Sequence, residues 1–198
     1  MNMEKKKPVG VIILNWNGAD LLRRYLPSVV ECNSGDIADV VVVDNGSTDG
    51  SRQVLETEFP EVRALYFPEN YGYAEGYNRA IKELGYEYSL LLNSDVEVTP
   101  GWLRPLYEYM QANGDVAACQ PKLLSETDRS KFEYAGASGG FIDKHGYPYC
   151  RGRIFDTVEE DRGQYDDVIE IFWATGAALM VRTGVYLAVG GLDKDFFA

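Results

Sequence analysis

Several groups of polar residues follow short apolar runs in this chain, and their types suit nucleotide and cation binding. The clearest group is Asn93-Ser94-Asp95, which directly follows the apolar residues 90–92. A short apolar run bounded by polar residues indicates a strand buried on both faces of a parallel sheet. Ligands of such sheets bind beyond the carboxyl ends of the strands. Asp95 is therefore the best single candidate for a metal ligand, Glu97 could assist it, and a simple strand-end turn is the alternative.

A second group has residue types suited to a nucleoside. Asp44 and Asn45 follow four valines at positions 40–43 and open a turn-rich loop that runs to Ser51. A carboxylate there can accept hydrogen bonds from the N–H groups of a base or the hydroxyl groups of a ribose. Asp, Asn, Gly and Ser are also the ordinary turn residues, so a purely structural turn is the alternative. The first apolar run likewise ends in a polar loop, Asn15-Trp16-Asn17-Gly18.

A third group lies where a helix is expected to begin and consists of Asn70, Gly72, Gly76 and Asn78. Glycine at a helix start lets phosphate oxygens approach the backbone closely. The spacing is not that of a dinucleotide site, because only one early glycine follows the strand. We therefore do not expect a Rossmann cofactor site.

These groups need a sheet that brings the strand ends together, and the hydrophobic pattern predicts one. Strand-like and helix-like segments alternate four times, which is typical of an α/β fold with a mainly parallel central sheet flanked by helices. The expected strands are residues 9–14, 40–43, 62–67, 88–92, 116–119, 169–173 and 177–181, and the expected helices are residues 19–30, 48–59, 73–84, 100–112 and 183–189. Residues 125–167 are polar, rich in Gly and Tyr, and show no clear period, so no element is predicted there.

The helix ends carry their own signals. Ser47 or Thr48 is expected to cap the second helix, and Thr183 the last one. Gly190-Gly191 is expected to end that last helix, and Pro27 to bend the first.

Composition narrows the chemistry further. The chain has 198 residues, 45% of them hydrophobic and 25% charged, which are ordinary values for one globular domain. Its formal net charge of -12 argues against a nucleic-acid surface. The single histidine, His145, excludes a multi-histidine metal site, and Cys32, Cys119 and Cys150 have neither metal nor redox spacing. A metal here must be held mainly by carboxylate, phosphate and water oxygens, which indicates Mg2+ or Mn2+.

The chain also lacks the signals of a membrane or secreted protein. No apolar run approaches the ~18 residues that a membrane helix needs. Residues 1–8 form a polar tail with lysines at positions 5–7 and no apolar signal core. We expect a cytoplasmic protein whose tail either solubilises the chain or touches an anionic membrane surface.

Four stretches carry a family resemblance in their order and spacing. They read Ile-Leu-Asn-Trp-Asn-Gly at 13–18, Val-Val-Asp-Asn-Gly-Ser-Thr-Asp-Gly-Ser at 42–51, Pro-Glu-Asn-Tyr-Gly-Tyr-Ala-Glu-Gly-Tyr-Asn at 68–78 and Leu-Leu-Asn-Ser-Asp-Val-Glu-Val at 91–98. Trp-Ala-Thr-Gly-Ala at 173–177 and Gly-Gly-Leu-Asp-Lys-Asp-Phe-Phe at 190–197 extend the match. Together they resemble family 2 glycosyltransferases, and the rhamnosyltransferase-like branch most closely, over residues 9–198.

The resemblance implies a GT-A fold with a smaller, mixed acceptor-side region, and it implies a reaction. A sugar would pass from a UDP- or dTDP-linked donor, with a divalent metal and inversion at the anomeric carbon, to a saccharide or lipid-linked acceptor in cell-surface polysaccharide synthesis. By family position the donor-binding residues would be Asn15, Asp44, Asn45, Asn70, Gly72, Asn78, Asn93 and Asp95, with the metal on Asp95. The acceptor-side residues would be Trp173, Gly176, Gly191 and Asp193. Residues 9–120 would form the nucleotide-sugar half and residues 121–198 the acceptor-side half.

The resemblance leaves the catalytic base unassigned. Family members continue past Phe196-Phe197 with an aromatic residue and a Glu-Asp pair that supplies the base, whereas Asp193 and Asp195 are the nearest carboxylates here. We therefore expect this form, taken as C-terminally truncated, to bind donor and metal but to turn over poorly. A non-catalytic nucleotide-sugar binding module is the second hypothesis. A nucleotidyltransferase is disfavoured, because it would need a basic Gly-rich loop where residues 15–18 stand.

Overall fold

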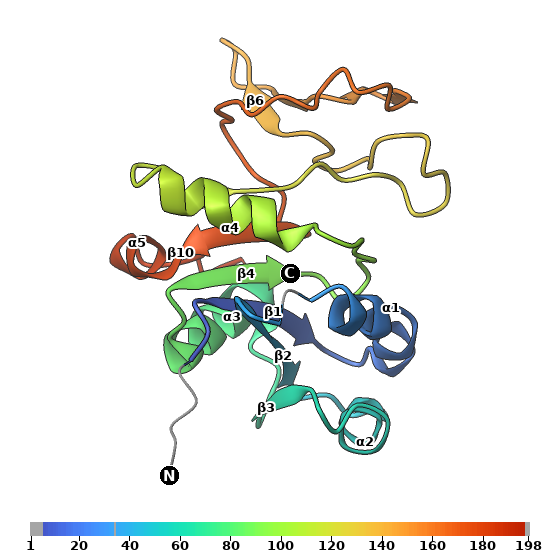
Figure 1. The fold of residues 1–198 in the computed structure, drawn as a ribbon, viewed down its shortest axis with the longest axis vertical. Coiled ribbons are helices and arrows are strands. Elements are labelled where there is room, and N and C mark those ends of the chain that lie inside the picture. Colours follow the sequence, from blue (N-terminus) through green and yellow to red (C-terminus); the bar gives the residue numbers. More distant parts are fainter. Residues whose placement is uncertain (1–5, 34, 197–198) are drawn as a thin grey trace.

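The structure is a computed structural model that describes residues 6–33 and 35–196. Residues 1–5 of the expected tail, together with Phe197 and Ala198, lie outside the described residues. Strands and helices alternate up to residue 112, and mostly short strands follow (Figure 1). In chain order the elements are β1 (Val9–Asn15), α1 (Ala19–Glu31), β2 (Ala38–Asn45), α2 (Ser51–Thr57), β3 (Arg63–Phe67), α3 (Gly72–Leu84), β4 (Tyr88–Leu92), α4 (Leu103–Ala112), β5 (Ala118–Cys119), β6 (Gly140–Ile142), β7 (Pro148–Cys150), β8 (Arg153–Ile154), β9 (Thr157–Val158), β10 (Ala178–Arg182) and α5 (Thr183–Ala188).

The main sheet has six strands in the order β3-β2-β1-β4-β10-β5. The four strands from β3 to β4 are parallel, whereas β10 runs antiparallel to both β4 and β5. The prediction of a mainly parallel sheet is therefore confirmed. Since β1, β2 and β4 point the same way, their carboxyl ends lie at one edge, with Asn15 in register opposite Asp44.

Helices cover both faces of this sheet (Figure 1). Residues of α1, α2 and α4 pack in one core cluster with Leu90 and Leu92 of β4, and residues of α3 and α5 pack in the other cluster with Leu91. Successive side chains of a strand point to opposite faces, so a run of leucines fills both layers. This explains why the apolar runs of the sequence are continuous rather than alternating.

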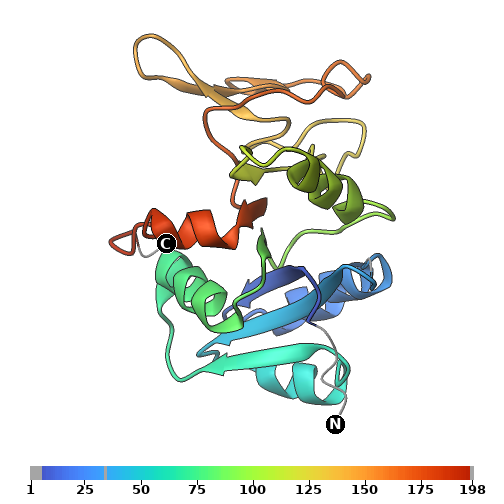
Figure 2. The same cartoon turned by 60° about the vertical axis from the view of Figure 1, so that its left-hand side comes forward.

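A second, four-stranded antiparallel sheet, β6-β7-β8-β9, lies at the end of the molecule away from β3 and α2 (Figure 2). All four of its strands lie within residues 125–167, where the sequence pattern assigned no element. These strands have only two or three residues each, so no apolar alternation can develop. Close packing on glycine joins the sheet to the rest: a Cβ on Gly140 would stand 2.0 Å from the Trp173 ring, and one on Gly152 would stand 2.6 Å from the Phe132 ring.

The expected strand at residues 169–173 was wrong. The segment makes one isolated bridge, between Gly140 and Trp173. Its apolar side chains instead pack onto glycines, with Ile171 against Gly139 and Trp173 against Gly140. The apolar side chains of a short run can therefore pack against neighbouring residues although the run does not form a strand.

Two of the predicted helix caps were wrong. Neither Ser47 nor Thr48 caps α2; the Asp49 carboxylate accepts the N–H of Ser51 at 2.9 Å instead. The hydroxyl group of Thr183 forms a 2.8 Å hydrogen bond with the hydroxyl group of Ser89 in β4 rather than with its own helix.

Other signals were read correctly or partly so. Gly190 and Gly191 follow α5 with φ angles of 93° and 76°, as expected of residues that end a helix. Pro27 lies inside α1, which continues to Glu31. In the part of the chain that the structure describes, no helix has the length and apolar character of a membrane span.

Candidate functional site

The ends of β1 and β2 are joined through buried polar side chains. Asn15 is fully buried and Asp44 is 4% exposed. The Nδ2 group of Asn15 donates to Oδ1 of Asp44 at 3.2 Å and to the hydroxyl oxygen of Ser47 at 3.3 Å. The same Ser47 oxygen accepts the backbone N–H of Asn17 at 2.9 Å. The two loops that follow these strands thus form one unit around the Asp44 carboxylate.

Two more side chains lock these loops together, and the sequence reasoning gave neither a role. Asn17, with a left-handed φ of 51°, accepts the N–H groups of Thr48 and Asp49 on Oδ1 at 2.7 and 3.3 Å. Asp49 accepts the N–H of Ala19 at 3.1 Å and that of Ser51, the first residues of α1 and α2. Burial acts to raise the pKa of Asp49, but these hydrogen bonds outweigh it and leave the pKa below its ordinary value. The loop composition Asn-Gly-Ser-Thr-Asp was the available signal.

A second cluster forms beside the first and contains three of the predicted residues. The Asn45 amide, 2% exposed, donates to Oδ1 of Asn70 at 2.9 Å and to the carbonyl oxygen of Gly72 at 3.1 Å. It accepts the N–H of Tyr71 at 3.1 Å, and Asn70 accepts the N–H of Gly72 at 2.8 Å. The end of β2 therefore orders the start of α3.

Asn78, predicted with this cluster, makes its described hydrogen bonds elsewhere. Its amide donates to the carbonyl oxygen of Leu192 at 2.8 Å and accepts the N–H of Leu192 at 2.9 Å. The hydroxyl group of Tyr186 also donates to it, at 2.6 Å. Gly191 leaves room for this contact, because a Cβ there would stand 2.2 Å from Oδ1 of Asn78. Asn78 thus ties α3 to the loop that carries Asp193.

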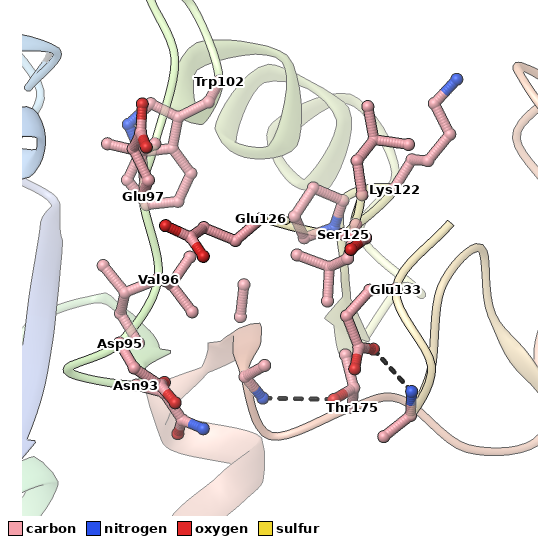
Figure 3. A pocket seen from close by; sticks show the side chains of 18 of the residues that line it. Asn93, Asp95, Val96, Glu97, Trp102, Lys122, Ser125, Glu126, Glu133 and Thr175 are labelled. Atoms are coloured by element: carbon pink, nitrogen blue, oxygen red, sulfur yellow. Dashed lines mark hydrogen bonds between the residues drawn. The ribbon is translucent and has the colours of Figure 1, made fainter. Parts of the chain in front are cut away.

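A cavity of about 680 Å³ opens at the end of β4. Its walls come from residues 92–102, residues 121–135 and residues 175–178, with Tyr73 of α3. Asn93, Asp95 and Gly176 of the predicted site residues line it. Figure 3 shows Asp95 and Glu97 on one side, with Glu133 and Thr175 across the cavity. The walls at residues 121–135 had no signal in the sequence.

Most of the charged groups on the cavity wall are paired. Lys122 forms ion pairs of 2.6 Å with Asp161 and Asp166, and Arg129 forms one of 2.6 Å with Glu97. Glu126 pairs with Arg24 of α1. Two carboxylates remain without a cation among the described residues: Asp95, which also has no hydrogen bond there, and Glu133, which accepts the N–H of Ala135 at 2.7 Å. The charge on the cavity wall that no described ion pair neutralises is therefore negative.

Two tyrosines of α3 support the inner wall. The hydroxyl group of Tyr73 donates to the carbonyl oxygen of Gly176 at 2.9 Å, and that of the fully buried Tyr77 donates to the carbonyl oxygen of Leu92 at 3.0 Å. Burial, with a smaller contribution from Tyr186, raises the pKa of Tyr73 to about 12. Both hydroxyl groups therefore stay protonated and donate at physiological pH.

The remaining predicted acceptor-side residues and the weak base candidates stand outside the cavity lining. Trp173 donates its indole N–H to the carbonyl oxygen of Phe141 at 2.9 Å, beside the small sheet. Asp193 and Asp195 are exposed, and the N–H of Asp195 donates to the Asp193 carboxylate at 3.0 Å. Of the acceptor-side set, Gly176 lines the cavity.

The residues present suit a cation that brings most of its own ligands. No group of three or more His, Cys, Asp or Glu side chains that could hold a metal occurs within residues 6–33 and 35–196. The open carboxylate of Asp95 lies beside Asn93 at the cavity. Mg2+ and Mn2+ are commonly held by one or two protein oxygens when phosphates and water complete the octahedron. The donor set therefore fits such a cation only together with a phosphate ligand.

Solved structures share this architecture, which is the GT-A fold. S. aureus TarS superimposes with a TM-score of 0.66 at 17% identity, covering 98% of this chain and 52% of that one. The mannosyltransferase PcManGT from Pyrobaculum calidifontis, in complex with GDP-Man and Mn2+, superimposes with a TM-score of 0.63 at 17% identity, covering 96% and 49%. The predicted GT-A fold is confirmed.

The family is shown by sequence. Residues 10–171 match the profile described as Glycosyl transferase family 2, so the chain belongs to the family 2 glycosyltransferases. A relative from Mycobacterium tuberculosis, named N-acetylglucosaminyl-diphospho-decaprenol L-rhamnosyltransferase, is 26% identical over 202 residues, covering 94% of this chain and 65% of the relative. Glycosyltransferase GlyA from Streptococcus pneumoniae is 29% identical over 191 residues, covering 94% and 27%. The resemblance to the rhamnosyltransferase-like branch is confirmed, and the chain spans 65% of the length of that relative.

Proposed function

We propose that this chain binds a nucleotide-diphosphate sugar across the carboxyl ends of β1, β2 and β4 and serves its transfer, with inversion, to a saccharide or lipid-linked acceptor. One observation carries the proposal. The buried polar clusters around Asp44 and Asn45 lie at the carboxyl ends of β1 and β2, at the same sheet edge as the end of β4, where Asp95 opens onto a cavity of about 680 Å³. A donor laid along this edge would have its nucleoside at Asp44 and its sugar at the mouth of the cavity.

The nucleoside half of the donor site would use fixed acceptors and donors. Asp44 would accept from base N–H or ribose hydroxyl groups. Asn45, Asn70 and Gly72 would hold the backbone at the start of α3, where phosphate oxygens can approach N–H groups. The solved structures of TarS in complex with UDP and of PcManGT in complex with GDP-Man share this fold and support a nucleotide as the ligand. UDP or dTDP is the proposed nucleotide.

Asp95, with Asn93 beside it, would hold Mg2+ or Mn2+ once the donor phosphates are present. When bound, the cation neutralises the charge that grows on the departing diphosphate. The presence of Mn2+ with GDP-Man in the PcManGT structure supports this assignment. Asp95 has no competing ion pair among the described residues, whereas Glu97 is held by Arg129.

The acceptor would occupy the cavity, whose volume lies in the usual range for small-molecule sites. Trp102 lines it, and its indole N–H is buried with no hydrogen-bond partner in the described part of the chain. Glu133 offers a carboxylate oxygen to a sugar hydroxyl, and Leu123 offers an apolar surface. The name of the M. tuberculosis relative supports a lipid-linked acceptor, and with it a peripheral position at the cytoplasmic face of the membrane.

Calorimetric titration tests this proposal. UDP and dTDP would be titrated into the chain with and without Mn2+, and into Asp95→Ala. The expected result is metal-dependent binding of one nucleotide that disappears in the variant. Glu83→Ala is the matched control, because Glu83 is an exposed carboxylate on α3 away from the cavity, and binding should survive there. Absence of binding by the unmodified chain, or equal binding by Asp95→Ala, would contradict the proposal.

One observation favours a second candidate, a donor-binding module without turnover. The base candidates Asp193 and Asp195 are exposed and stand outside the cavity lining. A base must lie within hydrogen-bond reach of the proton that it removes. Incubation with dTDP-rhamnose and a lipid-linked N-acetylglucosamine acceptor separates the two candidates, because only the enzyme forms a disaccharide product.

A further inference from the structure

We propose that Asn15 is a positioning residue that fixes one carboxylate oxygen of Asp44 and so presents the other oxygen to the donor. This inference rests on the proposed function, because it assigns Asp44 to the nucleoside. It differs from the role that the family resemblance implied for Asn15, which was direct contact with the donor.

The hydrogen bonds of Asn15 carry this inference. Its Nδ2 group donates to Oδ1 of Asp44 at 3.2 Å and to Ser47 at 3.3 Å, so both amide hydrogens have partners. Oδ2 of Asp44 has no hydrogen-bond partner among the residues that the structure describes. A buried donor that holds one carboxylate oxygen restricts the rotation of the carboxylate group. The second oxygen then points in one direction. Asp44 is therefore prepared before the donor arrives, which reduces the ordering cost of binding.

The amide oxygen of Asn15, in contrast to its N–H groups, makes no hydrogen bond within the described residues. Its Oδ1 atom is buried without a hydrogen-bond partner in the described residues. It faces the backbone of Gly18, where a Cβ would stand only 2.4 Å away. A side chain that leaves a buried acceptor unpaired loses stability there. The position is therefore used for its two N–H donors, and those donors point to Asp44 and Ser47.

Among the described residues, no charged side chain near Asp44 orients its carboxylate, so we assign this positioning role to Asn15. Arg52 of α2 and Tyr66, the register partner of Asp44 in β3, are the side chains whose ionisation Asp44 influences. Arg52 forms an ion pair of 2.8 Å with Glu56. Asp49 accepts hydrogen bonds from the backbone N–H groups at the starts of α1 and α2. No ion pair to Asp44 occurs in residues 6–33 and 35–196. The Asn15 amide is thus the buried donor that orients the carboxylate.

Exchanging the two side chains separates positioning from a merely structural role. Three variants are needed: Asn15→Asp, Asp44→Asn, and the double variant that carries both changes. Urea unfolding is followed at pH 5 and pH 7.5, and UDP and dTDP are titrated calorimetrically with Mn2+. In the double variant an amide again faces a carboxylate, but the carboxylate stands at position 15.

Asn15→Asp places two buried carboxylates about as far apart as the Asn15 amide and the Asp44 carboxylate are now. Two carboxylates at this distance share a proton, so the pKa of one of them rises. A pKa raised in the folded state supports stability at low pH and removes it as pH rises. The urea midpoint of this variant should therefore fall, relative to the unmodified chain, between pH 5 and pH 7.5. The double variant should recover the midpoint at pH 7.5.

Nucleotide affinity should behave differently. We expect a loss of at least about tenfold in each single variant, as for a charge-assisted hydrogen bond. The double variant should stay as weak as the singles although its stability has returned. Recovery of affinity in the double variant would overturn the inference, as would an Asn15→Asp midpoint that is independent of pH. If the unmodified chain binds neither nucleotide, the proposed function fails and this role for Asn15 fails with it.

Discussion

Gly46 stands between the two polar clusters, and replacing it with alanine should separate them. Gly46 follows Asn45 with a left-handed φ of 72°. A Cβ at this position would stand 2.4 Å from the carbonyl carbon and 2.6 Å from the Cα atom of Glu69, and 2.7 Å from the backbone nitrogen of Asn70. Those atoms are backbone and cannot rotate away. The loop after β2 must therefore move away from the segment that leads into α3.

The expected cost has two parts. An alanine in the left-handed region costs about 1–2 kcal/mol relative to glycine. Overpacking a tight contact costs roughly 1–3 kcal/mol. The sum, roughly 2–5 kcal/mol, is a large fraction of the ~5–15 kcal/mol by which domains are stable. For a chain of this size it corresponds to a fall in Tm of roughly 4–20 °C.

Urea unfolding with matched variants measures this cost. Gly184→Ala is the control, because Gly184 lies in α5 with no neighbouring atom within 4 Å of an added Cβ. Alanine in a helix is favoured over glycine by about 1 kcal/mol, so this variant should be neutral to slightly more stable. Equal stability of Gly46→Ala and Gly184→Ala would refute the reasoning from backbone contact at Gly46.

Three further predictions concern hydrogen-bonded side chains elsewhere in the fold. Tyr77→Phe removes the hydrogen bond to the carbonyl oxygen of Leu92 and should lower the free energy of unfolding by about 1 kcal/mol in urea titrations. Arg182→Met removes a guanidinium that donates to the main-chain carbonyls of Asn113 and Val116, which follow α4, and to the Tyr88 hydroxyl group. It should cost about 2–3 kcal/mol by the same measurement. The lowered pKa of Asp49 means that its contribution to stability is present at neutral pH and is lost as pH falls below its ordinary value of 3.8 through the folded-state value. Asp49→Asn should therefore flatten the acid limb of the stability curve, and an unchanged limb would contradict this account.

The strands that could be predicted are those with continuous apolar runs, because both faces of such a strand are buried. The valines before Asp44 and the leucines before Asn93 form strands covered on both faces, so each run ends where the sheet ends. The small sheet could not be predicted, because its strands of two or three residues gain their order from contacts on glycine such as that of Trp173 on Gly140. The residues at 169–173 were misread for the same reason, since tertiary packing used their apolar side chains without pairing them.

The candidate site divides in the same way. The position of Asp44 and Asn45 at one sheet edge could be predicted, because polar residues that follow buried parallel strands meet there; their role in binding stays a prediction. The role of Asn78 could not be found, because its partner Leu192 lies 114 residues away. The cavity wall with Glu133 gave no signal, because wall residues in an irregular segment follow neither helical nor strand spacing.

The strand order of the main sheet has a consequence for synthesis. β10 follows the other five strands of this sheet in the chain, yet it lies between β4 and β5. Until residue 182 has left the ribosome, β4 presents an unpaired edge of three leucines, and β5 has no partner. Open edges of this kind pair readily with other chains. While residues 93–182 are being made, aggregation therefore competes with folding, and a chaperone that shields the β4 edge has most to contribute at this stage.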